Sequence, residues 1–222
     1  MSKYHFHQRF HPPHDLRVDG VVQFLEVMQQ AFGLLGWIDA DEQLVDLRRD
    51  LIERALRSQA STSDLKRFGV NWVVKSVEMK NLLLVCIGVG GDEWCENSFH
   101  LDASRVSLLP DLSFFRQSIE SIRPFEAFIL EEKNDDELRE KRQQQTQTSR
   151  NGGPLALHWF HYMNEETANV VGGLSHCLQT PAFKVERFCE GVLFQLTAEP
   201  FDARNPQHQK MQNRAMIHLG LE

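Results

Sequence analysis

The sequence lacks any apolar run long enough to cross a membrane. A membrane-spanning helix needs about 18 to 20 consecutive apolar residues, whereas the longest apolar stretch, residues 82–89, has the length of a strand. The apolar central block of a secretory signal peptide is also missing, because Tyr4 to His7 alternate in character and Pro12 and Pro13 follow closely. We therefore expect a cytoplasmic protein that does not bind membranes.

Cysteine is scarce and has no spacing typical of a metal site. The sequence contains 4 cysteines, none of them arranged as a C-x-x-C pair, and they lie in or beside apolar stretches. Isolated apolar cysteines in a cytoplasmic protein are usually reduced and buried. We expect reduced thiols, with a disulfide or a metal site as the less favoured alternatives, at Cys86, Cys95, Cys177 and Cys189.

An excess of positive charge is also lacking. The net charge is −7 at pH 7, from 24 lysines and arginines against 31 aspartates and glutamates. A protein that binds nucleic acid directly needs basic side chains to neutralise phosphates. The acidic balance therefore predicts no direct nucleic-acid partner, and it suits a basic protein partner.

The pattern of apolar residues predicts a mixture of helices and strands. These elements do not alternate regularly, as they would around a parallel sheet, so we expect an α+β fold of antiparallel sheets with packed helices. The last helix is expected to be N-capped by Asn205 and to have an inner face of Met211, Ala215, Ile217 and Leu219. The expected elements are strand 4–10, a helix after Asp19, a helix after Asp41 that includes Leu44, strands 70–74, 82–89 and 94–101, a helix after Pro110, strands 125–130, 155–163 and 191–197, and a helix from Pro206.

One segment breaks this pattern. Residues 131–150 are almost wholly polar, with Leu138 as the only large apolar side chain, and Gly152-Gly153-Pro154 follows. A segment that is polar all round has no face to bury, so we expect a solvent-exposed arm. The sequence thus predicts one domain over residues 1–222, with two β-rich halves, 1–130 and 154–222, joined by a polar inserted arm, 131–153.

Histidines are the first candidates for chemistry. Four lie within residues 5–14, and His5 and His7 share one face of the expected strand, but neither a cysteine nor a carboxylate stands at a ligand spacing. His158 and His161 lie on opposite faces if residues 155–163 form a strand, so they are not expected to act as co-ligands. We interpret His161 as a core or interface histidine and predict no metal site.

Two short motifs resemble a catalytic site and a dinucleotide-binding site, but each lacks residues that such a site requires. Ser175-His176-Cys177 lacks a nucleophile elbow and is interpreted as a loop. Gly88, Gly90 and Gly91 lack the third glycine of a dinucleotide fingerprint, so a hairpin turn near Asp92 explains them better.

The alternative enzymatic interpretation is a magnesium-dependent nuclease. Asp111, Glu131 and Lys133 match the loose PD…ExK pattern, in which the carboxylates hold Mg²⁺ and the lysine steadies the attacking water. However, Asp111 opens a helix here instead of ending a strand, and an acidic surface repels a phosphodiester backbone. We therefore expect no enzyme, with this nuclease, or an adaptor domain of unrelated function, as the alternative.

The C-terminal third resembles the bacterial immunity protein family numbered fifty-two. The resemblance rests on the aromatic segment 158–163 around Trp159, on the strand that begins at Gly191, and on the turn 200–208, which reads P-F-D-A-R-N-P-Q-H. The sequence departs from the family in two respects. His158 replaces the glycine that usually precedes the tryptophan, and the polar arm is longer.

This resemblance implies a specific function. The chain would be an antidote to a polymorphic toxin delivered by type VI secretion, a DNase with a restriction-endonuclease-like fold, and would neutralise it by binding, with no cofactor and no catalytic residue. The oligomeric state stays open. Acidic loops and exposed tryptophans are then the expected toxin contacts. These residues are Trp37, Asp92, Glu93, Trp94, Glu131, Glu132, Asp135 and Asp136.

Overall fold

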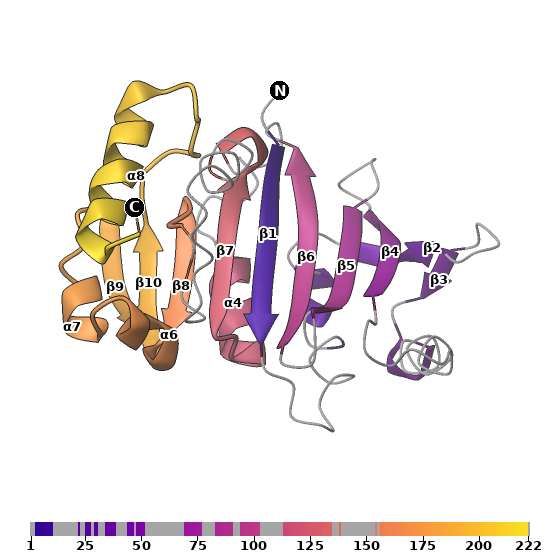
Figure 1. Cartoon of the computed structure of the whole chain (residues 1–222). Coiled ribbons are helices and arrows are strands. Elements are labelled where there is room, and N and C mark those ends of the chain that lie inside the picture. Colours follow the sequence, from indigo (N-terminus) through magenta and orange to yellow (C-terminus); the bar gives the residue numbers. More distant parts are fainter. Residues whose placement is uncertain are drawn as a thin grey trace. The chain divides into compact units, whose positions relative to one another are not determined.

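The fold of the chain is given by a computed structural model (Figure 1). Its chain divides into two compact units. Unit 1 comprises Met1–Phe6, Leu101–Ser107 and Pro124–Glu222, and unit 2 comprises His7–His100 and Leu108–Arg123. The described residues are 3–10, 22, 25–27, 29–30, 34–38, 44–46, 48–51, 69–76, 83–90, 94–102, 113–134, 138, 154 and 156–221.

Unit 2 contains a run of antiparallel strands in the order β3-β2-β4-β5-β6. The hairpin predicted around the glycines is confirmed, because Gly90 of β5 pairs with Trp94 of β6. The strands are β2 (Leu34–Ile38), β3 (Leu44–Asp46), β4 (Gly69–Ser76), β5 (Leu83–Gly90) and most of β6 (Trp94–Asp102).

Helix α4 (Ser113–Ile122) belongs to the same unit and follows Pro110 as predicted. It buries Phe115 and Ile119 on one face, together with the hydroxyl of Ser118. The amide of Gln8 donates a hydrogen bond to the Ser118 carbonyl at 3.1 Å, so the buried glutamine satisfies a backbone group of the helix.

The prediction of a helix directly after Asp41 is wrong. Leu44–Asp46 forms β3, which pairs with Gly36–Ile38 of β2, a strand that the sequence did not predict. Helical structure is described only from Arg49 to Leu51, where Arg49 and Asp50 are exposed as expected. Short apolar runs fit a strand or a helix equally well, and here strand pairing decides between them.

Unit 1 is built on strands in the order β1-β7-β8-β10-β9, and the pairs β7–β8, β8–β10 and β10–β9 are antiparallel. Phe128 pairs with His161, and His161 in turn pairs with Phe194, which places these three residues at one level of the sheet. The strands are β1 (Lys3–Phe10, of which residues 3–6 belong to this unit), β7 (Glu126–Glu131), β8 (Phe160–Asn164), β9 (Lys184–Phe188) and β10 (Gly191–Gln195).

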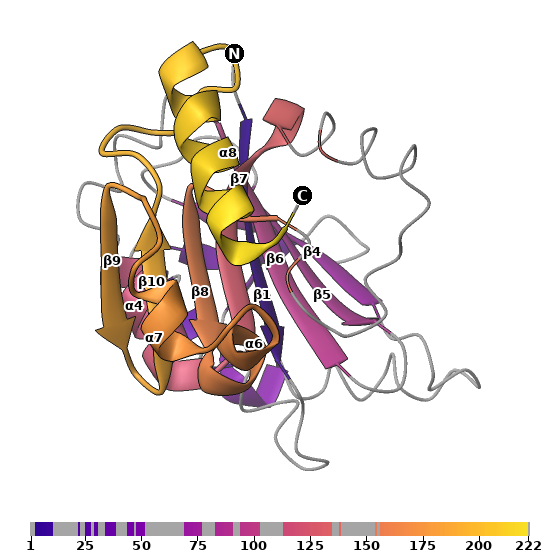
Figure 2. The ribbon, with the colours of Figure 1, turned by 60° about the vertical axis from the view of Figure 1, so that its left-hand side comes forward.

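Helices α6 (Glu165–Val170), α7 (Leu174–Cys177) and α8 (Pro206–Leu219) lie on the same side of the unit 1 strands in both views (Figures 1 and 2). The predicted cap of α8 is confirmed, because the Asn205 side chain accepts a hydrogen bond from the Gln207 amide at 3.0 Å. The buried stripe of α8 differs from the prediction, since Ile217 is 55% exposed. This stripe consists of His208, Gln212, Ala215 and Leu219.

Other predictions for unit 1 need correction. The strand expected over 155–163 begins only at Phe160. Ser175-His176-Cys177 lies in the short helix α7 and not in a loop. The sequence predicted neither α6 nor β9. The fold class is nevertheless α+β with antiparallel strands, as predicted.

The first residues of the predicted arm are part of unit 1. Glu131, Asn134 and Leu138 are all buried, and residues 132–134 are helical. Solvent exposure is therefore wrong for these three residues, whereas residues 135–137 and 139–153 lie outside the described part. β7, which the sequence places in the N-terminal half, pairs with β8 beyond the arm. The prediction of a single domain over 1–222 stays a prediction.

Throughout the described residues, no helix combines the length and the apolar character that a membrane crossing requires.

Candidate functional site

Trp159 is a structural anchor of unit 1. Its indole N–H donates to the Thr197 carbonyl at 3.2 Å, and its own carbonyl accepts from the Leu196 amide at 2.8 Å. Its ring also packs against Tyr4, with the ring centroids 5.7 Å apart. Trp159 is only 4% exposed, so it holds the end of β10 beside β1 and is not available to a partner.

Gly191 begins β10 because no side chain fits there. A Cβ atom at this position would lie 2.1 Å from the Met163 carbonyl oxygen and 2.9 Å from the Tyr162 ring. The clash with backbone cannot be relieved by a rotamer change. This close approach explains why β10 starts with glycine.

The turn 200–208 is fixed by hydrogen bonds that connect it to α8. The Asp202 amide donates to Nδ1 of His208 at 3.0 Å, and the Asp202 carboxylate accepts from the backbone and guanidinium of Arg204 at 2.9 and 3.1 Å. The hydrogen bond from Arg204 lowers the pKa of Asp202, and the same pairing raises the pKa of Arg204. These hydrogen bonds therefore fix the conformation of the turn that precedes the last helix.

Tyr4 joins this turn to the first strand. Its hydroxyl donates to the Phe201 carbonyl at 2.9 Å, and Tyr4 and Phe201 are both buried. Burial raises the pKa of Tyr4 to about 12, with a further contribution from the nearby carboxylates of Glu131 and Asp202. The residues that carry the family resemblance thus form the internal frame of unit 1.

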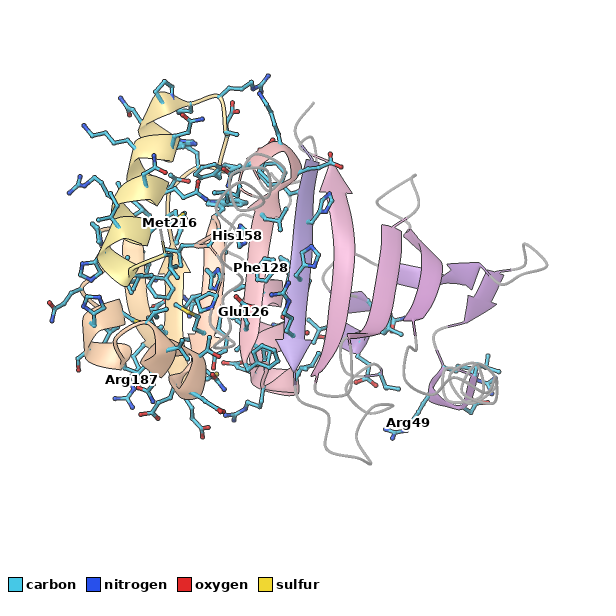
Figure 3. All side chains as sticks on the ribbon, viewed as in Figure 1. Arg49, Glu126, Phe128, His158, Arg187 and Met216 are labelled. Carbon is cyan, nitrogen blue, oxygen red and sulfur yellow. The ribbon has the colours of Figure 1, made fainter. Side chains whose placement is uncertain are left out.

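Glu126 of β7 and His161 of β8 form a buried polar cluster together with His158; Glu126 and His158 are labelled in Figure 3. Nε2 of His161 is 3.2 Å from a carboxylate oxygen of Glu126, with side-chain exposures of 0% and 6%. The His158 amide donates to Nδ1 of His161 at 3.4 Å, so a neutral His161 carries its proton on Nε2, facing Glu126. His161 is thus a core histidine, as predicted, and both ionisable side chains of the pair are closed off from solvent.

The expected separation of His158 and His161 is wrong. Their rings stack at 5.7 Å with an interplanar angle of 11°, and Phe128 stacks against both, at 4.6 Å from His158 and 5.6 Å from His161. The reason is that His158 precedes β8 and does not follow strand alternation. Among the described residues, no group of three or more histidine, cysteine, aspartate and glutamate side chains is placed to hold a metal ion.

A second histidine pair connects α7 to α8. The rings of His176 and His218 stack at 4.1 Å. Gly172 lies directly behind His176, since a Cβ atom there would be 2.7 Å from the His176 ring. Gly172 has φ +104°, a conformation that favours glycine, so the backbone is shaped to admit this ring.

The structure describes part of the predicted toxin-binding set. Trp37 pairs with Val45 and Val74 in the sheet of unit 2, and Trp94 opens β6. Glu131 is buried, and its carboxylate accepts from the Asn134 amide at 2.9 Å. The remaining predicted contacts, Asp92, Glu93, Asp135 and Asp136, lie outside the described residues, as does Asp111 of the alternative nuclease trio.

Glu132 is the predicted contact whose carboxylate is described at the surface. Its side chain is 41% exposed and lies 3.8 Å from Nε2 of His5. Lys133, the third member of the nuclease pattern, is also exposed, whereas Glu131 is held inside. Neighbouring residues of this segment therefore have opposite environments.

Three exposed glutamates that the sequence did not single out form an acidic corner of unit 1. These residues are Glu165, Glu166 and Glu190. The Glu165 amide donates to the Glu190 carbonyl at 2.8 Å, which brings the start of α6 beside the β9–β10 turn. Glu190 is distant from the other two in the sequence, so only the fold gathers them. The available signal was the Glu-Glu pair directly after Asn164, an N-cap residue.

Comparisons with known proteins give a fold but no family. No family model matches the chain, and no curated protein matches it either. Among solved structures, the chain is similar to a protein described as Pseudomonas aeruginosa T6SS protein PA0821, where T6SS denotes the type VI secretion system. The match has a TM-score of 0.66 and 14% sequence identity, and it covers 99% of this chain and 73% of that one. The two proteins share a fold over essentially the whole length of this chain.

Proposed function

We propose that this chain is an immunity protein of type VI secretion, which binds and neutralises a cognate toxin in the cytoplasm of the producing cell. The observation that carries the proposal is the shared fold with a type VI secretion protein over 99% of the chain. The resemblance of residues 155–208 to an immunity family points independently to the same system. The toxin is proposed to be a DNase with a restriction-endonuclease-like fold, inhibited by binding alone.

The placement of the resembling residues supports a binding function. Trp159 and Phe201 are buried, and Gly191 lies where no side chain fits, so all three maintain the frame. Partner contacts therefore fall to the surface, where loops and side chains vary without cost to the fold.

The charge of the surface suits a basic partner. A DNase must present a basic cleft to the phosphate backbone. This chain has a net charge of −7, and the surface carboxylate of Glu132 and the acidic corner of Glu165, Glu166 and Glu190 could cover such a cleft. Complementary charge accelerates encounter and selects the partner, while buried anchors supply most of the affinity.

Co-expression tests the proposal directly. The chain is produced together with the toxin encoded beside its gene, and survival, co-purification and DNA cleavage are measured. We expect rescue of growth, a stable complex and stoichiometric loss of cleavage without turnover of any substrate by the chain. Cleavage of DNA by the chain itself, or continued killing despite good expression, would refute the proposal.

Charge reversal tests the acidic surface within that complex. The variant E165K/E166K should slow association by about tenfold at low salt, and the difference should shrink as salt rises. The control is Glu120→Lys, which reverses an exposed carboxylate of α4. An equal effect per reversed charge in both variants would indicate a general response to net charge and not a contact at α6.

The polar arm is tested by a shortened deletion. Removing residues 140–150 leaves the buried Asn134 and Leu138 in place. If the polar residues that follow Asp135 and Asp136 contribute to the interface, the deletion weakens toxin binding without lowering thermal stability. Unchanged affinity would exclude residues 140–150 from the interface.

A further inference from the structure

Strand β9 forms an edge of the unit 1 sheet. It pairs with β10 on one side, and no other described strand pairs with its second edge (Figure 1). The Leu196 amide donates to the Trp159 carbonyl of the β8 side at 2.8 Å, so by alternation Leu193 and Gln195 direct their backbone groups toward β9. Their partners in β9 are Glu186 and Lys184, so Val185 and Arg187 direct their amide and carbonyl groups toward the second edge.

The charged side chains of this strand match those of a second, antiparallel copy of the same strand. Residues 183–187 read Phe-Lys-Val-Glu-Arg, with the cation Lys184 and the anion Glu186 placed symmetrically about Val185. Lys184 and Glu186 lie on the same face of the strand, with Nζ 3.1 Å from the carboxylate, and Phe183 is 58% exposed. Reversing the strand about Val185 places each charge opposite its counter-charge.

Electrostatics select one register for such pairing. A two-fold axis at Lys184 would place two lysines opposite each other, and an axis at Glu186 would do the same for two glutamates. Like charges directly opposite on paired strands are destabilising. An axis at Val185 avoids both clashes, and it also makes Val185, whose backbone groups point outward, a hydrogen-bonded pair with its own copy.

We propose that β9 is a homodimerisation edge, pairing antiparallel with β9 of a second copy of this chain about a two-fold axis at Val185. Val185 then exchanges backbone hydrogen bonds with the partner's Val185. Lys184 lies opposite the partner's Glu186 in a non-hydrogen-bonded pair, and their side chains extend the existing ion pair into a network of alternating charges. On the other face, Phe183 lies opposite the partner's Arg187, which places a guanidinium against an exposed ring. The interface uses the same patch on both copies, as two-fold dimers do.

The charges also explain why the occupant is a second copy and not an arbitrary strand. Lysine on an edge strand usually prevents pairing, because a foreign strand leaves the charge uncompensated. Lys184 is compensated when the opposing residue is the partner's Glu186. This inference does not depend on the proposed immunity function, because it concerns the free chain.

Two single charge-reversal variants test the proposed interface. Molar mass is measured by light scattering and sedimentation for the wild type, Lys184→Glu and Glu186→Lys across a range of concentrations. We expect a wild-type dimer, and at least about tenfold weaker self-association for each variant, because its own copies now oppose like charges. A wild type that stays monomeric at its solubility limit, or a dimer that both variants leave intact, would overturn the proposal.

Mixing the two variants provides the matched rescue. E186K presents a lysine at both charged positions of the edge, whereas K184E presents a glutamate at both, so the two edges are complementary. The mixture should therefore form a heterodimer, and the double variant K184E/E186K, in which the two charges are exchanged, should form a homodimer again. Rescue also shows that neither single variant failed to fold. Loss of dimer in all these samples would mean that the substitutions act on stability, and the proposed pairing would be wrong.

Disulfide crosslinking of an introduced cysteine tests the register of the two paired strands. In a hydrogen-bonded antiparallel pair the two Cα atoms lie about 5.5 Å apart, within the range of a disulfide. Val185→Cys should therefore crosslink to its own copy under mild oxidation, beyond any crosslinking of the wild type. Lys184→Cys should not, because position 184 faces the partner's Glu186. The reverse result would reject the axis at Val185.

Discussion

The imidazole rings of His176 and His218 each donate a hydrogen bond to the backbone carbonyl of the other residue. Nε2 of His176 donates to the His218 carbonyl at 2.8 Å, and Nε2 of His218 donates to the His176 carbonyl at 3.1 Å. Because a carbonyl only accepts, both rings carry a proton on Nε2. Two side chains 42 positions apart in the sequence therefore join the last turn of α8 to α7.

Removing one ring should loosen this junction. His176→Ala eliminates the stacking and one donor, and it should lower the free energy of unfolding by about 1 to 2 kcal/mol. Gly172→Ala should cost a similar amount or more, because its Cβ would meet the His176 ring and φ is +104°. In urea unfolding, the double variant should be less destabilised than the sum, since the clash disappears with the ring. Strict additivity would contradict the contact.

Gly191→Ala should be among the most damaging small substitutions. The added Cβ would lie 2.1 Å from the Met163 carbonyl, so β10 must move away from β8, at a cost of about 3 kcal/mol or more. The control is Gly220→Ala, where no atom lies within 4 Å and only the left-handed φ of +67° opposes the change. That variant should lose about 1 kcal/mol. Equal losses in thermal or urea unfolding would argue against the close approach.

Tyr4 should make stability sensitive to alkaline pH. Its pKa is about 12 in the folded protein, against an ordinary value of 10.0, so the folded chain retains a proton that the unfolded chain releases. The stabilisation is complete below pH 10, and it should fall by up to about 1.4 kcal/mol per pH unit until about pH 12. Urea titrations of wild type and Tyr4→Phe over this interval measure the difference, which should narrow with rising pH. A constant difference would show that Tyr4 ionises alike in both states.

Cys177 should resist alkylation while the protein is folded. Burial raises the pKa of its thiol from 9.0 to about 11, and the side chain is fully enclosed. A pKa two units higher leaves about 100-fold less thiolate near neutral pH, before access is considered. Iodoacetamide labelling followed by peptide mass spectrometry should show slow modification at Cys177 that becomes fast in urea. Rapid labelling without denaturant would mean that α7 opens easily.

Local signals predict the end of the chain well. Asn205 and Pro206 are residues whose own conformational preferences start a helix, so the boundary of α8 needs no knowledge of the rest of the fold. The hairpin between Gly90 and Trp94 is local in the same sense. The prediction for Ile217 is wrong because apolar character alone does not decide which face of a helix is buried, and the buried face of α8 includes His208 and Gln212.

Features that depend on distant residues could not be predicted. β9 has charged residues at three of its five positions, and its strand conformation comes from pairing with β10. The stack of His158 and His161 depends on where β8 begins, and the acidic corner depends on a hydrogen bond between Glu165 and Glu190. The expected toxin contact Glu131 illustrates the same limit, because its position at the end of β7 turns its carboxylate inward.

The hydrogen bond from Tyr4 to Phe201 spans 197 positions of the sequence. A ribosome therefore releases the first strand long before its acceptor exists, and contacts of such sequence separation slow folding. Until the turn 200–208 has emerged, Tyr4 and the neighbouring aromatic residues lack the residues that bury them. Unit 1 can close only after this turn has emerged, so the rate of translation sets the earliest time at which unit 1 can fold.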